Sequence, residues 1–333
     1  MAKITLEFIA SKTGVSTVAV FKALNNQKGV SEKLRKKIKT YAKSVGYVNK
    51  SSKIGITKKR FIFFIRQDFF LTPSEQFYST IFYFLSAECS SANSVLQVAF
   101  IEEEQTIAKI NNVIGTFKPD GIFFAGEVGE KIIKEFAGHV IPTVFIDYYS
   151  PIYACNYIFV DNYQMSYMLT KYLIQRGHKR IGFIGDIAKT NSVADRYFGY
   201  LKALKEEKLE VNPAWHINEN IERRQDLLGL PNTPLQPTGY VCHCDSAAQR
   251  LYAMLAVTNQ RIPEDVSVVS FDNTNLCESL MPKLTSIGLH KDSAAKKAFN
   301  VMAEALKNKK ISVVQVKSHL VERESVKTIK LEK

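Results

Sequence analysis

The first 46 residues place hydrophobic side chains at the three- and four-residue spacing of amphipathic helices. Thr5, Ser16 and Ser31 each precede such a segment and are suitable N-caps, and Gly14 ends the first segment. The pattern therefore predicts a small bundle of three helices with a tight turn between the first two, a helix-turn-helix. The inward-facing positions are Leu6, Ile9 and Ala10 in the first helix, Val20, Ala23 and Leu24 in the second, and Leu34, Ile38, Ala42 and Val45 in the third.

After residue 60 the pattern changes to short β-rich hydrophobic runs that alternate with helix-length segments. This alternation predicts parallel sheets covered by helices on both faces, and about 270 residues require two such sheets. The intervening residues 47–60 are polar and basic, which is typical of a linker. The predicted strands are residues 60–65, 94–100, 120–126, 142–147, 180–186, 240–245 and 266–272.

Four of these predicted strands end on an aspartate, namely Asp147, Asp186, Asp245 and Asp272. Ligands of open α/β sheets bind beyond the carboxyl ends of the strands. We therefore expect a cleft between two lobes to collect these four carboxylates.

The net charge of +13 on the 333-residue chain is confined to one end. Residues 1–60 contain fifteen of the 45 lysines and arginines but two of the 32 acidic residues, which leaves 30 of each sign in the remainder. Such segregation favours a polyanionic partner, with nucleic acid ahead of a membrane surface. The outward face of the second helix carries Thr17, Val18, Phe21, Lys22 and Asn25.

These outward side chains suit the major groove of DNA. Lys22 can donate to a guanine edge or to a phosphate, and Thr17, Val18 and Phe21 can contact thymine methyl groups. An alternative is that Phe21 covers a neighbouring helix or domain.

Other classes of function lack their sequence signals. The five cysteines have no metal-like spacing, and the "CHC" of residues 242–244 predicts buried cysteines, because on a strand its side chains alternate between faces. Neither a secretory signal nor a membrane-spanning segment is present, so we expect a cytoplasmic protein. No catalytic motif, metal site or cofactor-binding loop is recognisable, and we expect no catalytic residues, metal or cofactor.

The sequence "ITLEFIASKTGVSTVAVFKALNNQKGVSEKLRKKIKTYAKSVGYV" resembles the DNA-binding headpiece of the lactose/galactose repressor (LacI/GalR) family. The segments "DNYQMSYMLTKYLIQRGHKRIGFIG" (161–185), "RIPEDVSVVSFDNT" (261–274) and "LVERES" (320–325) resemble its effector-binding core, which is similar to periplasmic sugar-binding proteins. The resemblance implies an α/β fold with a headpiece (1–46), a hinge (47–60) and a two-lobed effector-binding and dimerisation domain (61–333). It assigns residues of about 61–159 and 288–318 to lobe 1, and of about 160–287 and 319–333 to lobe 2.

The resemblance also implies roles for single residues. The expected DNA contacts are Thr5, Ser16, Thr17, Val18, Phe21, Lys22 and Asn25, with Ile56 as the wedge of a hinge helix in the minor groove. Asn49 and Lys50 stand where the family usually has proline and asparagine, so a plain linker is the alternative to that helix. The expected effector contacts are Asp147, Arg196, Cys244 and Asp272, although the family commonly has asparagine where Cys244 stands.

The function that follows is a transcriptional regulator, expected to be a repressor, that binds a double-stranded operator as a homodimer. Its effector is expected to be a small molecule, a sugar or a sugar phosphate. The alternatives are control by a protein corepressor and, from another class, an α/β enzyme with a basic tail.

Overall fold

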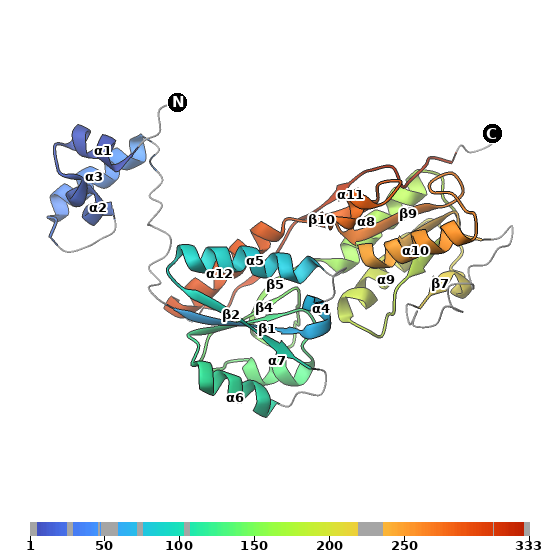
Figure 1. Ribbon diagram of the computed structural model, residues 1–333, viewed down its shortest axis with the longest axis horizontal. Helices are drawn as coiled ribbons and strands as arrows, with labels where there is room; N and C mark the ends of the chain where they lie inside the picture. Colours follow the sequence, from blue (N-terminus) through green and yellow to red (C-terminus); the bar gives the residue numbers. More distant parts are fainter. Residues whose placement is uncertain are drawn as a thin grey trace. The chain divides into compact units, whose positions relative to one another are not determined.

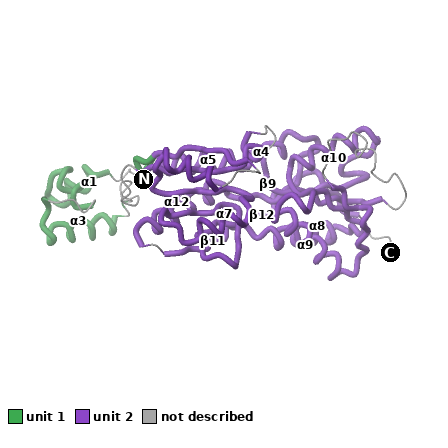
Figure 2. Tube along the Cα trace, turned by 90° about the horizontal axis from the view of Figure 1, so that it is seen from below, with its two compact units in different colours: residues 1–58, 91–94 green, residues 59–90, 95–333 purple. Residues whose placement is uncertain are grey.

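The computed structural model of the chain describes residues 5–24, 29–45, 47, 59–71, 76–102, 107–218, 236–308 and 310–329. The chain divides into two compact units, residues 1–58 with 91–94 and residues 59–90 with 95–333 (Figure 2). Among the described helices, none combines the length and the apolar composition that crossing a lipid bilayer requires. The domain and lobe boundaries expected from the sequence stay predictions.

The smaller unit is the predicted three-helix bundle (Figure 1). Thr5 and Ser16 are N-caps as expected, because their hydroxyl oxygens accept hydrogen bonds from the backbone N–H groups of Phe8 (3.3 Å) and Ala19 (3.2 Å). Gly14 ends the first helix with a φ of 72°, a conformation that favours glycine. The helices are α1 (Leu6–Thr13), α2 (Thr17–Leu24) and α3 (Glu32–Ser44).

The core of this bundle contains the side chains that the periodicity assigned to it, among them the fully buried Ile9, Val20 and Ile38. Arg35 is buried as well, which the charge pattern did not indicate. Its guanidinium donates hydrogen bonds to the carbonyl oxygens of Lys22 (3.3 Å) and Ala23 (3.4 Å). Arg35 therefore satisfies carbonyl groups at the C-terminal end of α2 that the helix itself leaves without donors.

The larger unit contains two six-stranded sheets. The first sheet has the strand order β11-β5-β4-β3-β1-β2, and all its described pairs are parallel. Its strands are β1 (Arg60–Arg66), β2 (Val95–Ile101), β3 (Gly121–Ala125), β4 (Thr143–Ile146), β5 (Asn156–Phe159) and β11 (Val313–Gln315).

The second sheet has the order β12-β10-β9-β8-β6-β7 and differs from the first in one pair. β12 runs antiparallel to β10, whereas the other described pairs are parallel. The chain passes between the two sheets after β5, after β10 and after β11. The strands are β6 (Ile181–Ile184), β7 (His216–Ile217), β8 (Gly239–Cys242), β9 (Ser267–Asp272), β10 (Thr285–Leu289) and β12 (Ser318–Val321).

Helices cover both faces of each sheet, as alternating strands and helices predict. Helices α5 and α12 lie on one face of the first sheet and α6 and α7 on the other (Figure 1). On the second sheet, Tyr240 of β8 packs with Leu251 of α10, while Gly239 faces Leu173 of α8. The helices of this unit are α4 (Gln67–Leu71), α5 (Gln76–Ser91), α6 (Ile107–Phe117), α7 (Glu130–Phe136), α8 (Asn162–Gln175), α9 (Asn191–Glu206), α10 (Asp245–Val257), α11 (Leu276–Ser279) and α12 (Lys291–Asn308), with a short 3-10 turn at Pro213–Trp215.

The predicted strands are all present, and the expected fold class, a small helical unit with two sheets of the periplasmic-binding-protein kind, is confirmed. Burial on both faces explains the clarity of their signal, since five consecutive residues of β1, Phe61–Ile65, are buried. The strand predicted at 240–245 is too long, because β8 ends at Cys242 and Asp245 begins α10. The hydrophobic pattern missed β5, β7, β10, β11 and β12.

Candidate functional site

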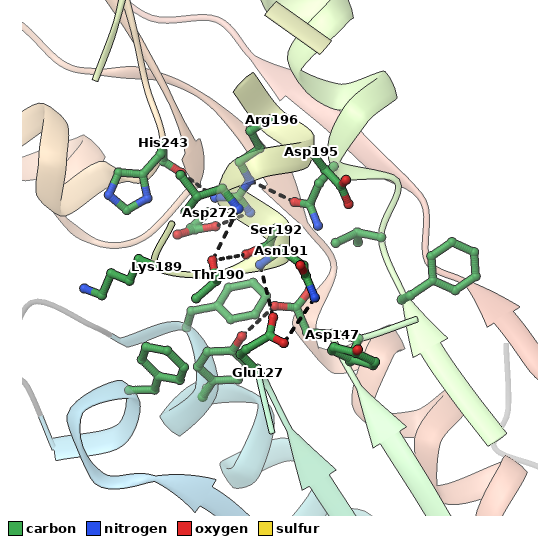
Figure 3. Close-up of a pocket in the computed structure, with 18 of the residues that line it drawn as sticks. Glu127, Asp147, Lys189, Thr190, Asn191, Ser192, Asp195, Arg196, His243 and Asp272 are labelled. Atoms are coloured by element: carbon green, nitrogen blue, oxygen red, sulfur yellow. Dashed lines mark hydrogen bonds and ion pairs between the residues drawn. The ribbon is translucent and has the colours of Figure 1, made fainter. Parts of the chain in front are cut away.

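A cavity of about 530 Å³ opens where the carboxyl ends of strands from both sheets meet (Figure 3). Glu127 follows β3 and Asp147 follows β4 on one side, whereas Arg196 of α9 and Asp272 at the end of β9 lie on the other. The order of the strands in each sheet places these ends together, as the position rule for ligands in open α/β sheets predicts.

Arg196 is the most extensively bonded side chain of the cavity and is 6% exposed. Its Nε donates to Asn162 Oδ1 at 2.8 Å, and its Nη1 donates to the carbonyl oxygen of His243. Its Nη2 pairs with Asp272 Oδ1 at 3.4 Å. The guanidinium also lies over the ring of Phe271, 4.5 Å from the centroid. The protein thus holds this cation with bonds of its own on every nitrogen.

Asp147, on the opposite side, is bonded on one oxygen only. Its Oδ2 accepts a hydrogen bond from the hydroxyl of Tyr78 at 2.6 Å, while Oδ1 is buried without a partner in the described structure. The residue has a φ of 59°, which is uncommon for a side chain other than glycine. Burial raises the pKa of this carboxyl to about 6, and the nearby carboxylates of Asp272 and Glu127 add to the increase. A buried oxygen without a donor at a strained backbone position is typical of a ligand-binding group.

Asp272 also has a left-handed backbone, with a φ of 97°. Burial raises the pKa of its carboxyl, and the neighbouring Arg196 opposes this increase. Lys291, at the start of α12, donates to the backbone carbonyl oxygen of Asp272 at 2.7 Å. This bond joins a helix that packs on the first sheet to a strand of the second.

A second connection between the sheets was not expected from the sequence. Glu127 follows β3 of the first sheet and accepts hydrogen bonds from Asn191, the first residue of α9, which belongs to the second. The backbone N–H donates at 3.1 Å and the side-chain amide at 3.2 Å. Burial raises the pKa of Glu127, and the Asn191 backbone bond opposes that increase. The carboxylate lies at the N-terminus of α9, where the helix dipole favours negative charge.

The cavity also has an aromatic wall, for which the sequence gave no signal beyond the abundance of aromatic residues. Phe69 and Tyr78 stack with centroids 5.9 Å apart, and Tyr149 and Phe159 stack at 4.8 Å. Flat rings of this kind contact the apolar faces of small ring-shaped ligands. The aromatic residues that line the cavity are Phe69, Phe77, Tyr78, Tyr148, Tyr149 and Phe159.

The expectation that the cleft collects four aspartates is wrong for two of them. Asp186 does not line the cavity. Asp245 is 1% exposed, and its carboxylate accepts hydrogen bonds from the hydroxyls of Ser270, Ser286 (2.8 Å) and Thr274 (2.9 Å). Asp245 therefore joins α10 to β9 and β10 inside the second sheet's core and has no oxygen directed to a ligand.

The effector contact expected at Cys244 stays a prediction. Its buried thiol lies 3.0 Å from the hydroxyl of Ser246, and Cys244 does not line the cavity. Its neighbour His243 does line the cavity. Cys242 and Cys244 are buried, as expected, and so are the other three cysteines. The described residues contain no group of His, Cys, Asp and Glu side chains placed to hold a metal ion.

The expected DNA-contacting side chains lie together on the outer face of α2. Val18 is 60% exposed and Phe21 is 39% exposed, and Thr17 and Lys22 are partly exposed beside them. The hydroxyls of Thr5 and Ser16, also expected to contact DNA, serve as helix caps. Asn25 and Ile56 lie outside the described residues, as do Asn49 and Lys50 of the hinge.

The chain resembles known proteins along nearly its whole length. Residues 170–326 match the family described as periplasmic binding protein-like domain. The HTH-type transcriptional repressor PurR of Escherichia coli O139:H28 is 26% identical over 337 residues, which cover 97% of this chain and 96% of that relative.

Solved structures share the fold at lower identity. A complex of the transcriptional regulator CelR with cellobiose has a TM-score of 0.68 at 20% identity and covers 97% of this chain and 100% of its own. A LacI family transcriptional regulator from Enterococcus faecium with bound ribose has a TM-score of 0.70 at 19% identity and covers 81% of this chain and 100% of its own.

These relatives are transcription regulators and not enzymes. Their full-length match agrees with the order of parts in this chain, a capped helical bundle followed by two parallel-stranded sheets with a cavity at their strand ends. The chain is therefore similar, along nearly its whole length, to DNA-binding transcriptional regulators with an effector-binding domain, as its resemblance to the lactose/galactose repressor (LacI/GalR) family implies.

Proposed function

We propose that this regulator is a repressor whose affinity for its operator is controlled by a carbohydrate bound in the cavity. The observation that carries the proposal is the set Asp147, Arg196 and Asp272 at the strand ends of both sheets, beside an aromatic wall. Carboxylate oxygens and guanidinium groups supply the acceptors and donors that sugar hydroxyls need, and aromatic rings pack on sugar faces. The cellobiose and ribose in the two solved regulators support the same class of ligand.

The operator is read by α2 in the major groove, with Lys22 as the donor to a base edge and Thr17 and Val18 as the apolar contacts. Ile56 wedges into the minor groove. Two copies of the chain form a homodimer, so that two headpieces meet the two halves of a pseudo-palindromic site.

Control follows from a shift between two arrangements of the sheets that border the cavity. A ligand changes operator affinity only as far as it binds the two arrangements with different affinity. The coupling is reciprocal, so operator DNA must weaken the binding of an inducing carbohydrate by the same factor.

The test begins with operators selected from random duplex DNA by the full-length protein. Fluorescence anisotropy then measures their affinity with and without a panel of mono- and disaccharides and sugar phosphates. We expect at least one carbohydrate to weaken operator binding, and Arg196→Ala to remove this response while operator binding remains. Arg261→Ala is the matched control, because Arg261 pairs with Asp265 away from the cavity. Operator affinity that no carbohydrate changes would contradict the proposal.

A further inference from the structure

The side chains that line the cavity carry more negative than positive charge. Six carboxylates face three cationic side chains, Lys189, Arg196 and Arg250. In a cavity shielded from bulk water such an imbalance repels anions and attracts cations. The six carboxylates are Asp68, Glu127, Asp147, Asp161, Asp195 and Asp272.

Two of the groups that would favour an anion already bond to other parts of the protein. Arg196 bonds Asn162, the carbonyl oxygen of His243 and the carboxylate of Asp272. The first backbone N–H of α9, a helix N-terminus that would otherwise suit a phosphate, donates to Glu127. At these two donors a phosphate would meet the carboxylates of Glu127 and Asp272.

Among the described carboxylates of the cavity, Asp147 is the one with a buried oxygen that accepts no hydrogen bond. Asp272 pairs with Arg196, and Asp68 pairs with Arg66 at 2.8 Å. Asp147 forms no ion pair with any described residue, and its buried Oδ1 accepts no hydrogen bond. Burial raises the pKa of this carboxyl to about 6, although the hydrogen bond from Tyr78 and the charge of Arg196 oppose the increase.

The aromatic wall beside Asp147 already packs against cations of the protein. The guanidinium of Arg66 lies 4.7 Å from the ring centroid of Phe69, and the ammonium of Lys291 lies 5.5 Å from that of Phe77. Rings at these distances attract positive charge through their negative faces. Phe69 also stacks on Tyr78, whose hydroxyl donates to Asp147.

We propose that the effector carries a protonated amine, which pairs with the free Oδ1 of Asp147 while the ring that bears it packs on the aromatic wall, as an amino sugar would. This inference rests on the proposed carbohydrate control and specifies the charge of the ligand. It also makes Asp147 the residue that selects a cationic sugar over its neutral parent.

Matched triplets of sugars test it directly. Calorimetric titration of the full-length protein at about pH 7, where an amine with the pKa of an α-amino group is largely protonated, compares glucose, glucosamine and glucose 6-phosphate. The same comparison is made for the galactose and mannose series. We expect the amino form of one series to bind at least roughly tenfold more tightly than its parent, and its phosphate to bind less tightly than the parent. Asp147→Asn should abolish the tenfold preference, because an amide keeps the shape and loses the charge.

Asp186→Asn is the control, because it removes a carboxylate that follows β6 of the second sheet and does not line the cavity. This variant should keep the preference for the amino sugar. Tighter binding of a neutral or phosphorylated sugar would overturn the inference and leave carbohydrate control intact. An amine preference that survives Asp147→Asn would also overturn it. If no sugar of any series binds, carbohydrate control fails, and the inference fails with it.

Discussion

Asp147→Asn should stabilise the ligand-free protein at neutral pH, because the carboxylate is buried, forms no ion pair with a described residue and has one oxygen without a hydrogen bond. Asparagine has the same shape, and its side-chain oxygen can still accept the hydrogen bond from Tyr78. The substitution thus removes the charge with little change in packing. A binding group that costs stability in the absence of its ligand is common at functional sites.

The size of the effect follows from the pKa, which burial raises from 3.8 to about 6. At about 1.4 kcal/mol per pH unit, this difference corresponds to about 3 kcal/mol. The folded state holds the proton more tightly than the unfolded state. The stability that protonation of Asp147 contributes is therefore complete below about pH 4 and is lost as the pH rises through about 6. An asparagine at this position does not titrate, so we expect the free energy of unfolding of the Asp147→Asn variant to exceed that of the parent by about 1–3 kcal/mol above pH 7.

Urea denaturation of the ligand-free chain at a series of pH values from about 4.5 to 8 measures this difference. The two free energies of unfolding should converge towards the acidic end and separate as the pH passes about 6. A difference that stays constant across the series, or a variant less stable than the parent at pH 8, would refute the reasoning.

Asp265→Asn provides a control of opposite sign. The guanidinium of Arg261 (2.9 Å) and its backbone N–H (2.8 Å) donate to Asp265 and lower the pKa of that carboxyl to about 2. The stability contributed by this carboxylate is present above the unfolded pKa and is lost as the pH falls towards 2. Its replacement should therefore destabilise the protein at neutral pH, by a small amount because the pair is at the surface.

Three further outcomes follow from packing and from the DNA-facing side chains. Gly199→Ala should cost roughly 2 kcal/mol or more in a denaturation experiment, because a methyl group there would collide with the carbonyl oxygen of Tyr163. Gly115→Ala, on an open helix face, should be neutral or stabilise the protein by about 0.5–1 kcal/mol. Equal effects of the two substitutions would show that α8 and α9 do not pack this closely. Asp245→Ala should cost roughly 3 kcal/mol or more, since two buried hydroxyls and one partly buried hydroxyl lose their acceptor, and an unchanged urea midpoint would contradict the network. Lys22→Ala should reduce operator discrimination by roughly 1–3 kcal/mol in anisotropy titrations, and an equal loss on random DNA would make it a phosphate contact.

The fold was predictable wherever burial left a simple pattern. β1 and β3 read as strands because helices cover both of their faces and every inward position must be apolar. β10 did not, because its buried Thr285 and Ser286 are polar. Their hydroxyls are satisfied by the backbone N–H of Arg323 and by the carboxylate of Asp245. A pattern of hydrophobicity cannot show partners that lie some 40 residues away in the sequence.

The candidate site also has some residues that the sequence predicts and others that depend on contacts formed only in the fold. Positions after a strand are visible in the sequence, and Asp147 and Asp272 meet at the cavity for that reason. Asp245 occupies the same kind of position, yet its carboxylate accepts hydrogen bonds from hydroxyls that only the folded sheet brings close to it. Arg35 shows the corresponding limit for charge. It counts towards the basic segment, but its guanidinium is bonded to the backbone carbonyl groups of α2.

The proposed control of DNA binding from this cavity depends on contacts that a ligand can exchange. Glu127 of the first sheet bonds to Asn191 of α9, a helix of the second sheet. Asp272 of the second sheet bonds to Lys291 of α12, a helix that packs on the first. A ligand that only filled the space would bind both arrangements of the sheets equally and would shift nothing. A ligand that competes for Glu127 or Asp272, or that gives Asp147 its missing counterion, changes the relative free energy of the two arrangements. In the proposed mechanism, the carboxylates therefore determine which molecules bind and also whether binding changes the affinity for the operator.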